Sequence, residues 1–561
     1  MPVGSQERAE TFAKYLENVQ WRVRPPGPAL ESIPLRPTIG ISCSPFSIAE
    51  LTAALRKLKA QKACGPDMLP PEYYKAILHS QEALQELLQF LNRCWAERTV
   101  PEDWHLARVT EIFKKGDAAQ CSNYRPISLL NLGYKLFASL LLRRLQDSGT
   151  DSFIWPTQYG FKAGMGTADA LFATRRLIER TWNSKAEKRL FLALDWAKAF
   201  DSISPSSLAI ALTRFGLPSH FVEMFGAIYS SRKFYVDECN TSSNIHHQHY
   251  GISQGCPLSP YLFIIVMSVL MEDSHSKLRR DHGVEFPVGS INEIVYADDT
   301  LLVGSDAQTV EKQLSCIVEL GRAYGLEMNW QKVELLTVRC DLPIRGPDAT
   351  ELVRKTSLVY LGSSVSADGN VDSELARRIG LAQSEFKRLA QVWRHTSLDN
   401  VEKYRLYRTC VLSWLLYGLQ ALWLGKVGRR KLDGFHARCA RHILNIAPSY
   451  FSRVSNKEVL SKLGAPTLSA MLLQQQLNYF GKLARRPHSC KIRSMVFKED
   501  LSMQVLEAPR RRGRPRLEWT NEIFKVVGKM FESHAIFSAC VSNAMQWRCC
   551  IRTFCRAATP A

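Results

Sequence analysis

The sequence predicts an α+β protein with more than one domain. Its 561 residues exceed the length that a single hydrophobic core usually supports. Short β-like runs alternate with helical patterns over residues 105–340, which is typical of an α+β domain. Residues 372–480 place Leu, Ala and aromatic residues at intervals of three and four, which predicts a mostly helical region.

The first 100 residues divide into two parts. Residues 1–45 are Pro-rich and weakly patterned, so we interpret them as a leader or linker. A capping-box pattern, Ser47-x-x-Glu50, then begins a helix whose apolar face would carry Leu51, Leu55 and Leu58. Residues 66–95 predict two further helices, and we expect residues 46–100 to form an N-terminal helical extension.

Charge and composition favour a nucleic-acid-binding protein. The net charge of +20 points first to nucleic acid and second to acidic membrane surfaces. Fifteen cysteines without a regular framework, together with a polar start at Met1, predict reduced thiols in a nuclear or cytoplasmic protein that is not secreted. The longest apolar run, Tyr261 to Met271, is too short to span a bilayer, so no membrane partner is expected.

Three acidic residues predict a metal site. Tyr296-Ala297-Asp298-Asp299 lies between two short apolar runs, which predicts a tight hairpin with two carboxylates at its turn. Because two like charges at one turn do not stabilise it, we expect a cation there. Upstream, an apolar run predicts a buried strand that ends at Asp195. Carboxylates at neighbouring strand ends suit Mg²⁺ and two-metal phosphoryl transfer.

Two neighbouring segments carry further candidates. Phe200 is expected either to lie beneath the sugar of a nucleotide or to be a core aromatic residue, and Asp201 to be a structural or capping carboxylate. Ser259 and Pro260 predict the start of a helix, and the glycines before them let the backbone approach a flat ligand. Gln254 could contact a nucleotide or the template, although an ordinary loop-to-helix junction explains the segment equally well.

In their order and spacing, these segments resemble motifs A, B and C of the reverse transcriptases encoded by non-LTR (LINE-type) retrotransposons. Cys64 stands where that family usually has Pro. Further segments resemble other blocks of the same family: residues 62–67, 113–117, 123–130, 158–162, 167–170, 325–332 and 360–362.

The resemblance implies a right-hand polymerase. Residues 101–365 would form the fingers and a palm with an antiparallel sheet, and residues 366–480 a helical thumb with a post-palm region. Residues 481–561 would then be a basic, helical, nucleic-acid-binding tail, with 16 Lys and Arg against 6 Asp and Glu.

The resemblance also implies a role for each candidate residue. Asp195, Asp298 and Asp299 would hold two Mg²⁺ ions, with Mn²⁺ as an alternative metal. Lys332 would be a proton donor to the leaving pyrophosphate, and Lys114, or Lys115 in its place, would bind the dNTP triphosphate. The remaining substrate-binding candidates are Arg125, Phe200, Gln254 and Gly255.

A dense basic cluster lies in the C-terminal region. Its sequence resembles a minor-groove AT-hook and is also compatible with a nuclear import signal or a solvated loop. We expect it to contact template RNA or target DNA through Arg510, Arg511, Arg512, Arg514 and Arg516.

The expected activity is that of an RNA-directed DNA polymerase, which extends a DNA primer on an RNA template from dNTPs. One alternative is a catalytically silent or truncated retroelement relic that only binds nucleic acid. Another is an RNA-dependent RNA polymerase, against which Phe200 and the Tyr-Ala-Asp-Asp sequence argue, or an intron-encoded maturase. Nothing in the chain resembles an endonuclease, so a separate endonuclease is an expected partner within a ribonucleoprotein.

Overall fold

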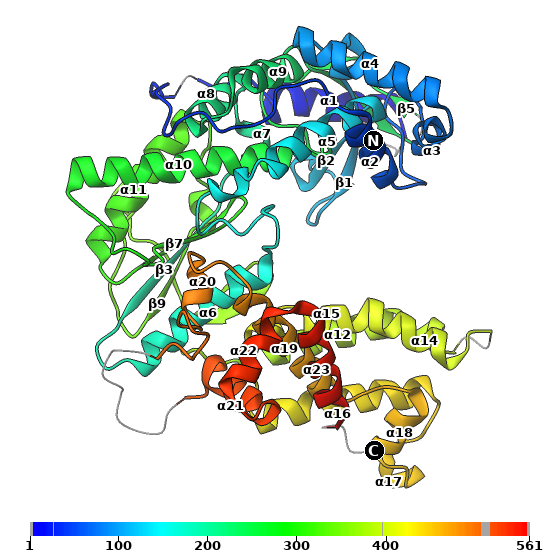
Figure 1. Cartoon of the computed structure of the whole chain (residues 1–561), viewed down its shortest axis with the longest axis vertical. Coiled ribbons are helices and arrows are strands. Elements are labelled where there is room, and N and C mark those ends of the chain that lie inside the picture. The colour runs from blue at the N-terminus through cyan, green and yellow to red at the C-terminus, as the bar shows by residue number, and fades with distance from the viewer. Residues whose placement is uncertain (1–3, 26, 240, 395–396, 506–515, 558–561) are drawn as a thin grey trace.

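The computed structural model describes residues 4–25, 27–239, 241–394, 397–505 and 516–557. In this part of the chain, two five-stranded sheets and a two-stranded hairpin are surrounded by helices, so the predicted mixture of helix and sheet is confirmed. Figure 1 shows the elements up to α11 (Ala307–Ala323) in the upper and left part of the molecule, and the helices from α12 (Asp372–Arg388) onward in the lower part.

The central sheet has the strand order β10-β9-β3-β8-β7. The middle strand β3 (Arg189–Leu194) runs antiparallel to both β8 (Asp299–Gly304) and β9 (Glu334–Val338). At the edges, β7 (Glu293–Tyr296) is antiparallel to β8, and β10 (Arg354–Lys355) is parallel to β9. This pairing brings the end of β3 next to the turn between β7 and β8.

Both faces of this sheet are buried, and alternate residues of β3 belong to different cores. Leu190, Leu192 and Leu194 pack with α10 (Ser259–His282), whereas Phe191 packs with α6 (Thr167–Asn183) and the C-terminal helices. The longest apolar run of the sequence, Tyr261 to Met271, is therefore a buried part of helix α10. None of the described helices is both long enough and apolar enough to cross a bilayer.

The second sheet has the order β2-β1-β4-β5, with β6 paired to β4. Strand β1 (Leu106–Phe113) is antiparallel to β2 (Tyr124–Leu129) and parallel to β4 (Lys233–Glu238). The other two strands are β5 (Thr241–Ser242) and β6 (His246–His247). The helices of this part of the molecule also include α5 (Leu132–Asp147), α7 (Ala199–Ser202), α8 (Pro205–Phe215) and α9 (Ser219–Tyr229).

The three helices expected before residue 100 are present as α2 (Ile48–Lys57), α3 (Pro71–Ala76) and α4 (Gln81–Glu97). The capping box at the start of α2 is complete, because the side chain of Ser47 accepts from the backbone of Glu50 and the Glu50 side chain accepts from the backbone of Ser47.

The interpretation of residues 1–45 as a leader or linker does not fit the structure. Helix α1 (Gln6–Tyr15) is capped by Ser5 and buries Ala9, Phe12 and Ala13 in the same core as Leu190. Leu16 and Trp21 continue the buried surface. Apolar residues at 9, 12, 13 and 16 are a helical pattern, and the prolines that follow obscured it.

A third core joins the helices of residues 372–472. It is built around Trp393, Tyr407, Leu412 and Phe435. The helices that follow α12 are α13 (Ala390–Arg394), α14 (Asn400–Leu406), α15 (Ser413–Leu416), α16 (Lys426–Ile443), α17 (Ser449–Ser452) and α18 (Asn456–Leu463). This region is as helical as the sequence predicts.

The C-terminal region is folded onto the central sheet. Helix α19 (Leu468–Ala484) runs through the domain boundary expected at residue 481, and Phe480, Trp519 and Trp547 are buried in the same core as Phe191. The other helices here are α20 (Lys491–Ser494), α21 (Trp519–Met530), α22 (His534–Ser542) and α23 (Ala544–Ala557). The described part of residues 481–557 is therefore part of the body of the protein and not a separate tail.

Candidate active site

The turn between β7 and β8 has the predicted hairpin geometry. Tyr296 pairs with Asp299, so Ala297 and Asp298 form a two-residue turn, and Ala297 has a positive φ of 56°. A non-glycine residue in this conformation needs support from its surroundings. Asp298 thus lies at the tip of the turn, and Asp299 is the first residue of β8.

Gln158 supplies that support. Its side-chain Oε1 accepts from the backbone N–H of Ala297 and of Gly160, each at 2.8 Å, and its Nε2 donates to the carbonyl of Ala297 at 3.3 Å. The Gln158 side chain is buried. A Cβ atom at Gly160 would lie 2.4 Å from the Ala297 nitrogen, so only glycine fits beside the turn. Residues 158–162 resemble a block of the reverse transcriptase family, but the sequence alone did not predict this role for Gln158.

Asp195 lies directly after β3, as predicted. The backbone N–H of Asn329 donates to the Asp195 carbonyl at 2.8 Å, and the Asn329 side-chain amide donates to Oδ2 at 3.1 Å. Lys332 Nζ lies 3.0 Å from the same Oδ2. The segment around residues 329–332 therefore fixes the backbone of Asp195 and contacts its carboxylate.

The neighbouring carboxylates repel one another. Burial, followed by the charge of Asp195, raises the pKa of Asp298. Desolvation, followed by the charges of Asp298 and Asp195, raises the pKa of Asp299 to about 6, although that side chain reaches solvent. Arg125 and Lys332 act in the opposite direction on Asp298. A cation bound near these residues would relieve the repulsion.

One cavity of about 700 Å³ brings most of the predicted site residues together. They come from segments that are far apart in the sequence, on β2, at the end of β3, on α7, before α10 and at the β7–β8 turn. The predicted residues that line the cavity are Lys114, Arg125, Asp195, Phe200, Gln254, Gly255, Asp298 and Lys332.

The cavity distinguishes between alternatives that the sequence left open. Lys114 lines it, whereas Lys115 does not. Asp299 is also outside the lining, so the cavity contains two of the three predicted metal ligands. Across the described residues, no group of three or more Asp, Glu, His and Cys side chains is arranged to hold a metal. The site is therefore a carboxylate pair and not a closed cage.

Phe200 is both a core residue and part of the cavity wall. Its ring stacks on Phe263 of α10 with centroids 4.2 Å apart and planes at 17°, and it meets Phe161 edge-on at 6.4 Å. The stacking fixes the ring against the helix while the residue still lines the cavity. The core interpretation fits these contacts, and the position of the ring beneath a nucleotide sugar stays a prediction.

Asp201 is a structural carboxylate, as interpreted from the sequence. It is buried and accepts from Gln20 Nε2 at 2.9 Å, Trp21 Nε1 at 2.8 Å and Gln254 Nε2 at 3.0 Å. Gln254 therefore lines the cavity with its amide already engaged. Gln20 also lines the cavity. No local pattern could reveal this contact, since Gln20 and Asp201 are 181 residues apart.

Gly255 makes room for strand β2 and not for the flat ligand that the sequence predicted. With a φ of 135°, its position would place a Cβ atom 2.1 Å from the Ser128 carbonyl oxygen, so the glycine admits strand β2 and not a flat ligand. The Ser128 N–H donates to the Gln254 carbonyl at 2.7 Å. This contact holds the loop before α10 against the strand that carries Arg125.

The matched family agrees with this geometry. Residues 112–365 match the family described as reverse transcriptase (RNA-dependent DNA polymerase). We refer to residues 112–365 as the reverse transcriptase domain, after the family that they match. The matched range begins in β1, ends in β12 and includes all eight of the cavity residues predicted from the sequence.

Similar proteins come from retrotransposons, which confirms the resemblance noted in the sequence. The chain is 27% identical to the transposon TX1 uncharacterized 149 kDa protein of Xenopus laevis over 333 residues, covering 58% of this chain and 25% of that protein. It is 24% identical over 489 residues to the Pol polyprotein from type-2 retrotransposable element R2DM of Drosophila melanogaster, covering 84% and 43%. It is 24% identical over 545 residues to the RNA-directed DNA polymerase from mobile element jockey of Drosophila funebris, covering 92% and 56%. The chain thus spans between a quarter and just over half of these relatives.

A short hairpin lies at the end of the reverse transcriptase domain. Strand β11 (Ser357–Tyr360) pairs with β12 (Ser363–Ser366), and both turn residues, Leu361 and Gly362, have positive φ angles of 45° and 69°. Arg377 and Arg378 of α12 donate to the Gly362 carbonyl and both contact Glu374. These two arginines support the hairpin.

The basic cluster outside the domain is only partly described. Arg510, Arg511, Arg512 and Arg514 lie outside the described residues. Arg516 donates to the Asp368 carbonyl and its guanidinium lies 3.9 Å from the centre of the Trp182 ring. Arg516 therefore contacts the reverse transcriptase domain away from the cavity.

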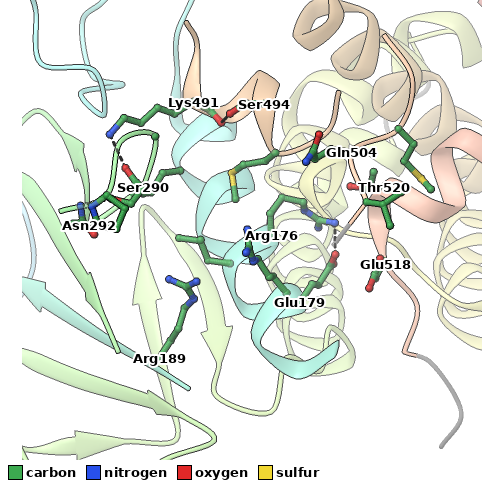
Figure 2. A pocket seen from close by; sticks show the side chains of 18 of the residues that line it. Arg176, Glu179, Arg189, Ser290, Asn292, Lys491, Ser494, Gln504, Glu518 and Thr520 are labelled. Atoms are coloured by element: carbon green, nitrogen blue, oxygen red, sulfur yellow. Dashed lines mark hydrogen bonds and ion pairs between the residues drawn. The ribbon is translucent and has the colours of Figure 1, made fainter. Parts of the chain in front are cut away.

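A second cavity, of about 480 Å³, lies where α20 and α21 meet the reverse transcriptase domain. Figure 2 shows Arg176 and Glu179 of α6 pointing toward each other, and Lys491 reaching the Ser290 carbonyl, 2.6 Å away. Burial, only partly offset by the charge of Arg176, raises the pKa of Glu179 to about 7. We call this the joint cavity, because its lining comes from the two regions that pack together here.

Proposed function

We propose that this chain is the RNA-directed DNA polymerase of a non-LTR retrotransposon, which extends a DNA primer on an RNA template by nucleotidyl transfer. The observation that carries the proposal is the cavity in which Asp195 and Asp298 lie with Lys114 and Arg125. Phosphoryl transfer needs carboxylates for metal and cations for phosphate at one place. The family match over the same residues supports it.

In this proposal, the protein has the right-hand layout of a polymerase, with fingers, palm and thumb. The β10-β9-β3-β8-β7 sheet with α6, α10 and α11 is the palm, and the β1–β2 hairpin with its neighbours is the fingers. Helices α12 to α18 are the thumb. The antiparallel pairing of β3 with β8, which supports the carboxylate pair, is the reason for assigning that sheet to the palm.

Asp195 and Asp298 would hold divalent ions, with Asp299 adding negative charge nearby. The residues fit such ions, because in addition to burial the charge of Asp195 raises the pKa of both Asp298 and Asp299, and among the described residues only Lys332 is within ion-pair distance of Asp195. Mg²⁺ commonly takes one or two carboxylates and completes its shell with water and substrate phosphates, so a pair suffices. When bound, Mg²⁺ or Mn²⁺ would lower the pKa of the primer hydroxyl and stabilise charge on the phosphates.

The other cavity residues bind and orient the dNTP. Ile112 pairs with Arg125 across β1 and β2, and this pairing places Arg125 close to Lys114, which follows β1. The planar fork of Arg125 suits phosphate oxygens, and Lys114 adds a point charge. Phe200, held by Phe263, would exclude a ribose 2′-hydroxyl. Lys332 is exposed enough to move from Asp195 to the leaving pyrophosphate.

The partners follow from the activity. We propose an RNA template, a DNA primer or target, and a separate endonuclease, in a nuclear or cytoplasmic ribonucleoprotein. These are properties of a whole element, and the relatives are longer than this chain.

The test is extension of a DNA primer on an RNA template with Mg²⁺, for wild type, Asp195→Asn and the control Asp147→Asn. Asp147 is an exposed carboxylate on α5, remote from the cavity lining. Wild type and the control should extend the primer, and Asp195→Asn should not. Binding without extension by the wild type would instead favour a silent relic.

A further inference from the structure

A third cavity, of about 1060 Å³, runs between the η7–α15 segment (residues 407–416) and helices α19 and α23. We call it the α19–α23 groove. It shares no lining residue with the active-site cavity among the residues that the structure describes. Its charged lining residues are all cations: Arg408, Lys482, Arg485, Arg548 and Arg552.

These cations have few partners of opposite charge. In the described chain, Arg408, Arg485, Arg548 and Arg552 form no salt bridge, and Lys482 is 3.9 Å from Asp169. Burial, followed by the charge of Arg548, lowers the pKa of Arg485. Cations that face one another without a carboxylate between them favour a bound anion.

The cations form two rows, which fits a linear anion. The amides Gln474 and Asn478 and the cations Lys482 and Arg485 are three or four residues apart along α19 and its C-cap, so they share one face over about 16 Å. On α23, Arg548 and Arg552 are four residues apart and share a face in the same way. A single phosphate would need only one cluster, whereas a polyphosphate backbone would contact both rows.

The rest of the lining suits bases and sugars. Amide side chains on α19 can both donate and accept hydrogen bonds. Tyr417 is exposed at one end of the groove, where its hydroxyl donates to the Leu361 carbonyl at 2.9 Å and the Arg378 guanidinium lies 4.7 Å from its ring centre. The groove therefore reaches the β11–β12 hairpin.

We propose that the α19–α23 groove binds a single nucleic-acid strand along its phosphates, as a site separate from the active-site cavity. This inference rests on the proposed function. A single strand fits better than a duplex, because base edges and faces are free to meet amide and aromatic side chains only when the bases are unpaired. RNA and DNA share this chemistry.

The test is the affinity of the full chain for a labelled single-stranded RNA, a single-stranded DNA of the same sequence and a blunt RNA–DNA duplex. Arg548→Glu/Arg552→Glu should weaken single-strand binding by about tenfold at low salt and reduce the slope of log affinity against log salt by about 1.4. The control Lys525→Glu/Lys529→Glu makes the same charge change at the same spacing on α21, outside the groove. It should leave single-strand binding unchanged.

The RNA and DNA arms identify which strand the groove prefers. An equal loss in the control, an equal loss for the duplex, or no loss at all would overturn the proposal. If the double Glu variant does not fold, Arg548→Gln/Arg552→Gln tests the same contacts and should weaken binding by about threefold. Wild-type extension on a short pre-annealed template reports separately on the proposed function.

Discussion

Charged side chains are arranged differently in the active-site cavity and in the joint cavity. In the active-site cavity, Asp195 and Asp298 lie together, and Lys332 contacts Asp195. The cations Lys114 and Arg125 lie on other segments. In the joint cavity, cations are matched locally, as in the Arg176–Glu179 pair. Charges that are grouped by sign need a partner from outside, whereas matched charges serve packing.

Burial raises the pKa of carboxyl groups at both places, but the neighbouring charges differ. Arg176 partly offsets the effect of burial on Glu179, whereas the charge of Asp195 adds to the effect of burial on Asp298. Desolvation can exceed the attraction within a buried ion pair, so such a pair is weak evidence for either stability or function. The described lining of the joint cavity does not group charges of one sign as a substrate-binding site would, so we assign no reaction to it. Each of the following changes tests this contrast.

The largest effect is expected at the support of the catalytic turn. Gln158→Met keeps the size of the side chain but removes its bonds to Ala297, so kcat for primer extension should fall about a hundredfold with little change in KM. Steady-state extension kinetics measure this. The matched control is Gln476→Met, a buried glutamine that donates to the Leu422 carbonyl in the helical region. Equal losses of kcat in both variants would show a general folding effect.

Glu179 in the joint cavity should make the free energy of unfolding depend on pH. The folded-state pKa of Glu179 is about 7, above the ordinary 4.5, so its contribution is full below pH 4.5 and is lost as the pH rises through 7. Wild type should lose about 2 kcal/mol of unfolding free energy between about pH 5.5 and about pH 8, and Glu179→Gln should not. Denaturant unfolding at both pH values measures this.

A neighbouring carboxylate, Glu187, provides the control for that experiment. Glu187 contacts Arg180 and Arg189 and, despite partial burial, its hydrogen bonds lower its pKa. Glu187→Gln should therefore keep the wild-type dependence above pH 5.5. Identical pH dependence in wild type and Glu179→Gln would mean that another group titrates.

The two adjacent lysines should differ at the active-site cavity. Lys114→Ala should raise KM for the dNTP about tenfold, because it removes a cation from the lining. Lys115→Ala should change KM by less than about twofold, since an exposed charge outside the lining is screened. The dNTP dependence of extension separates them. Equal increases of KM in the two variants would show that Lys114 and Lys115 contribute equally to dNTP binding.

The smallest effect concerns sugar selection. Phe200→Val opens the cavity wall that stacks on Phe263, so incorporation of ribonucleotides relative to deoxynucleotides should rise about fivefold. Phe153→Val, at an exposed ring near Arg36, is the control. Competition between dNTP and NTP in one extension reaction gives the ratio. An unchanged ratio would place sugar selection elsewhere.

The local features of the site could be predicted from the sequence. The apolar run before Asp195, the two-residue hairpin at Asp298 and the capping box at Ser47 each depend on neighbouring residues, and all three are present. The helical character of the region after residue 372 was also predictable from its periodicity.

Contacts between distant segments could not be predicted. The hydrogen bonds of Asp201 with Gln20 and Trp21 join residues about 180 positions apart, and no local pattern marks them. Gly255 was interpreted as room for a ligand, because a glycine shows that something approaches closely but not what approaches. Likewise, the charge of the C-terminal region did not show that α19 and α21 bury large aromatic side chains.

The most direct test of the account is Mg²⁺-dependent extension of a DNA primer on an RNA template, measured together with template–primer affinity for wild type and Asp298→Asn. Because Asp298 would hold metal and also repel phosphate, the account predicts extension by the wild type only, with the variant binding template–primer equally well or more tightly. Extension by Asp298→Asn at the wild-type rate, or loss of binding in parallel with activity, would contradict it.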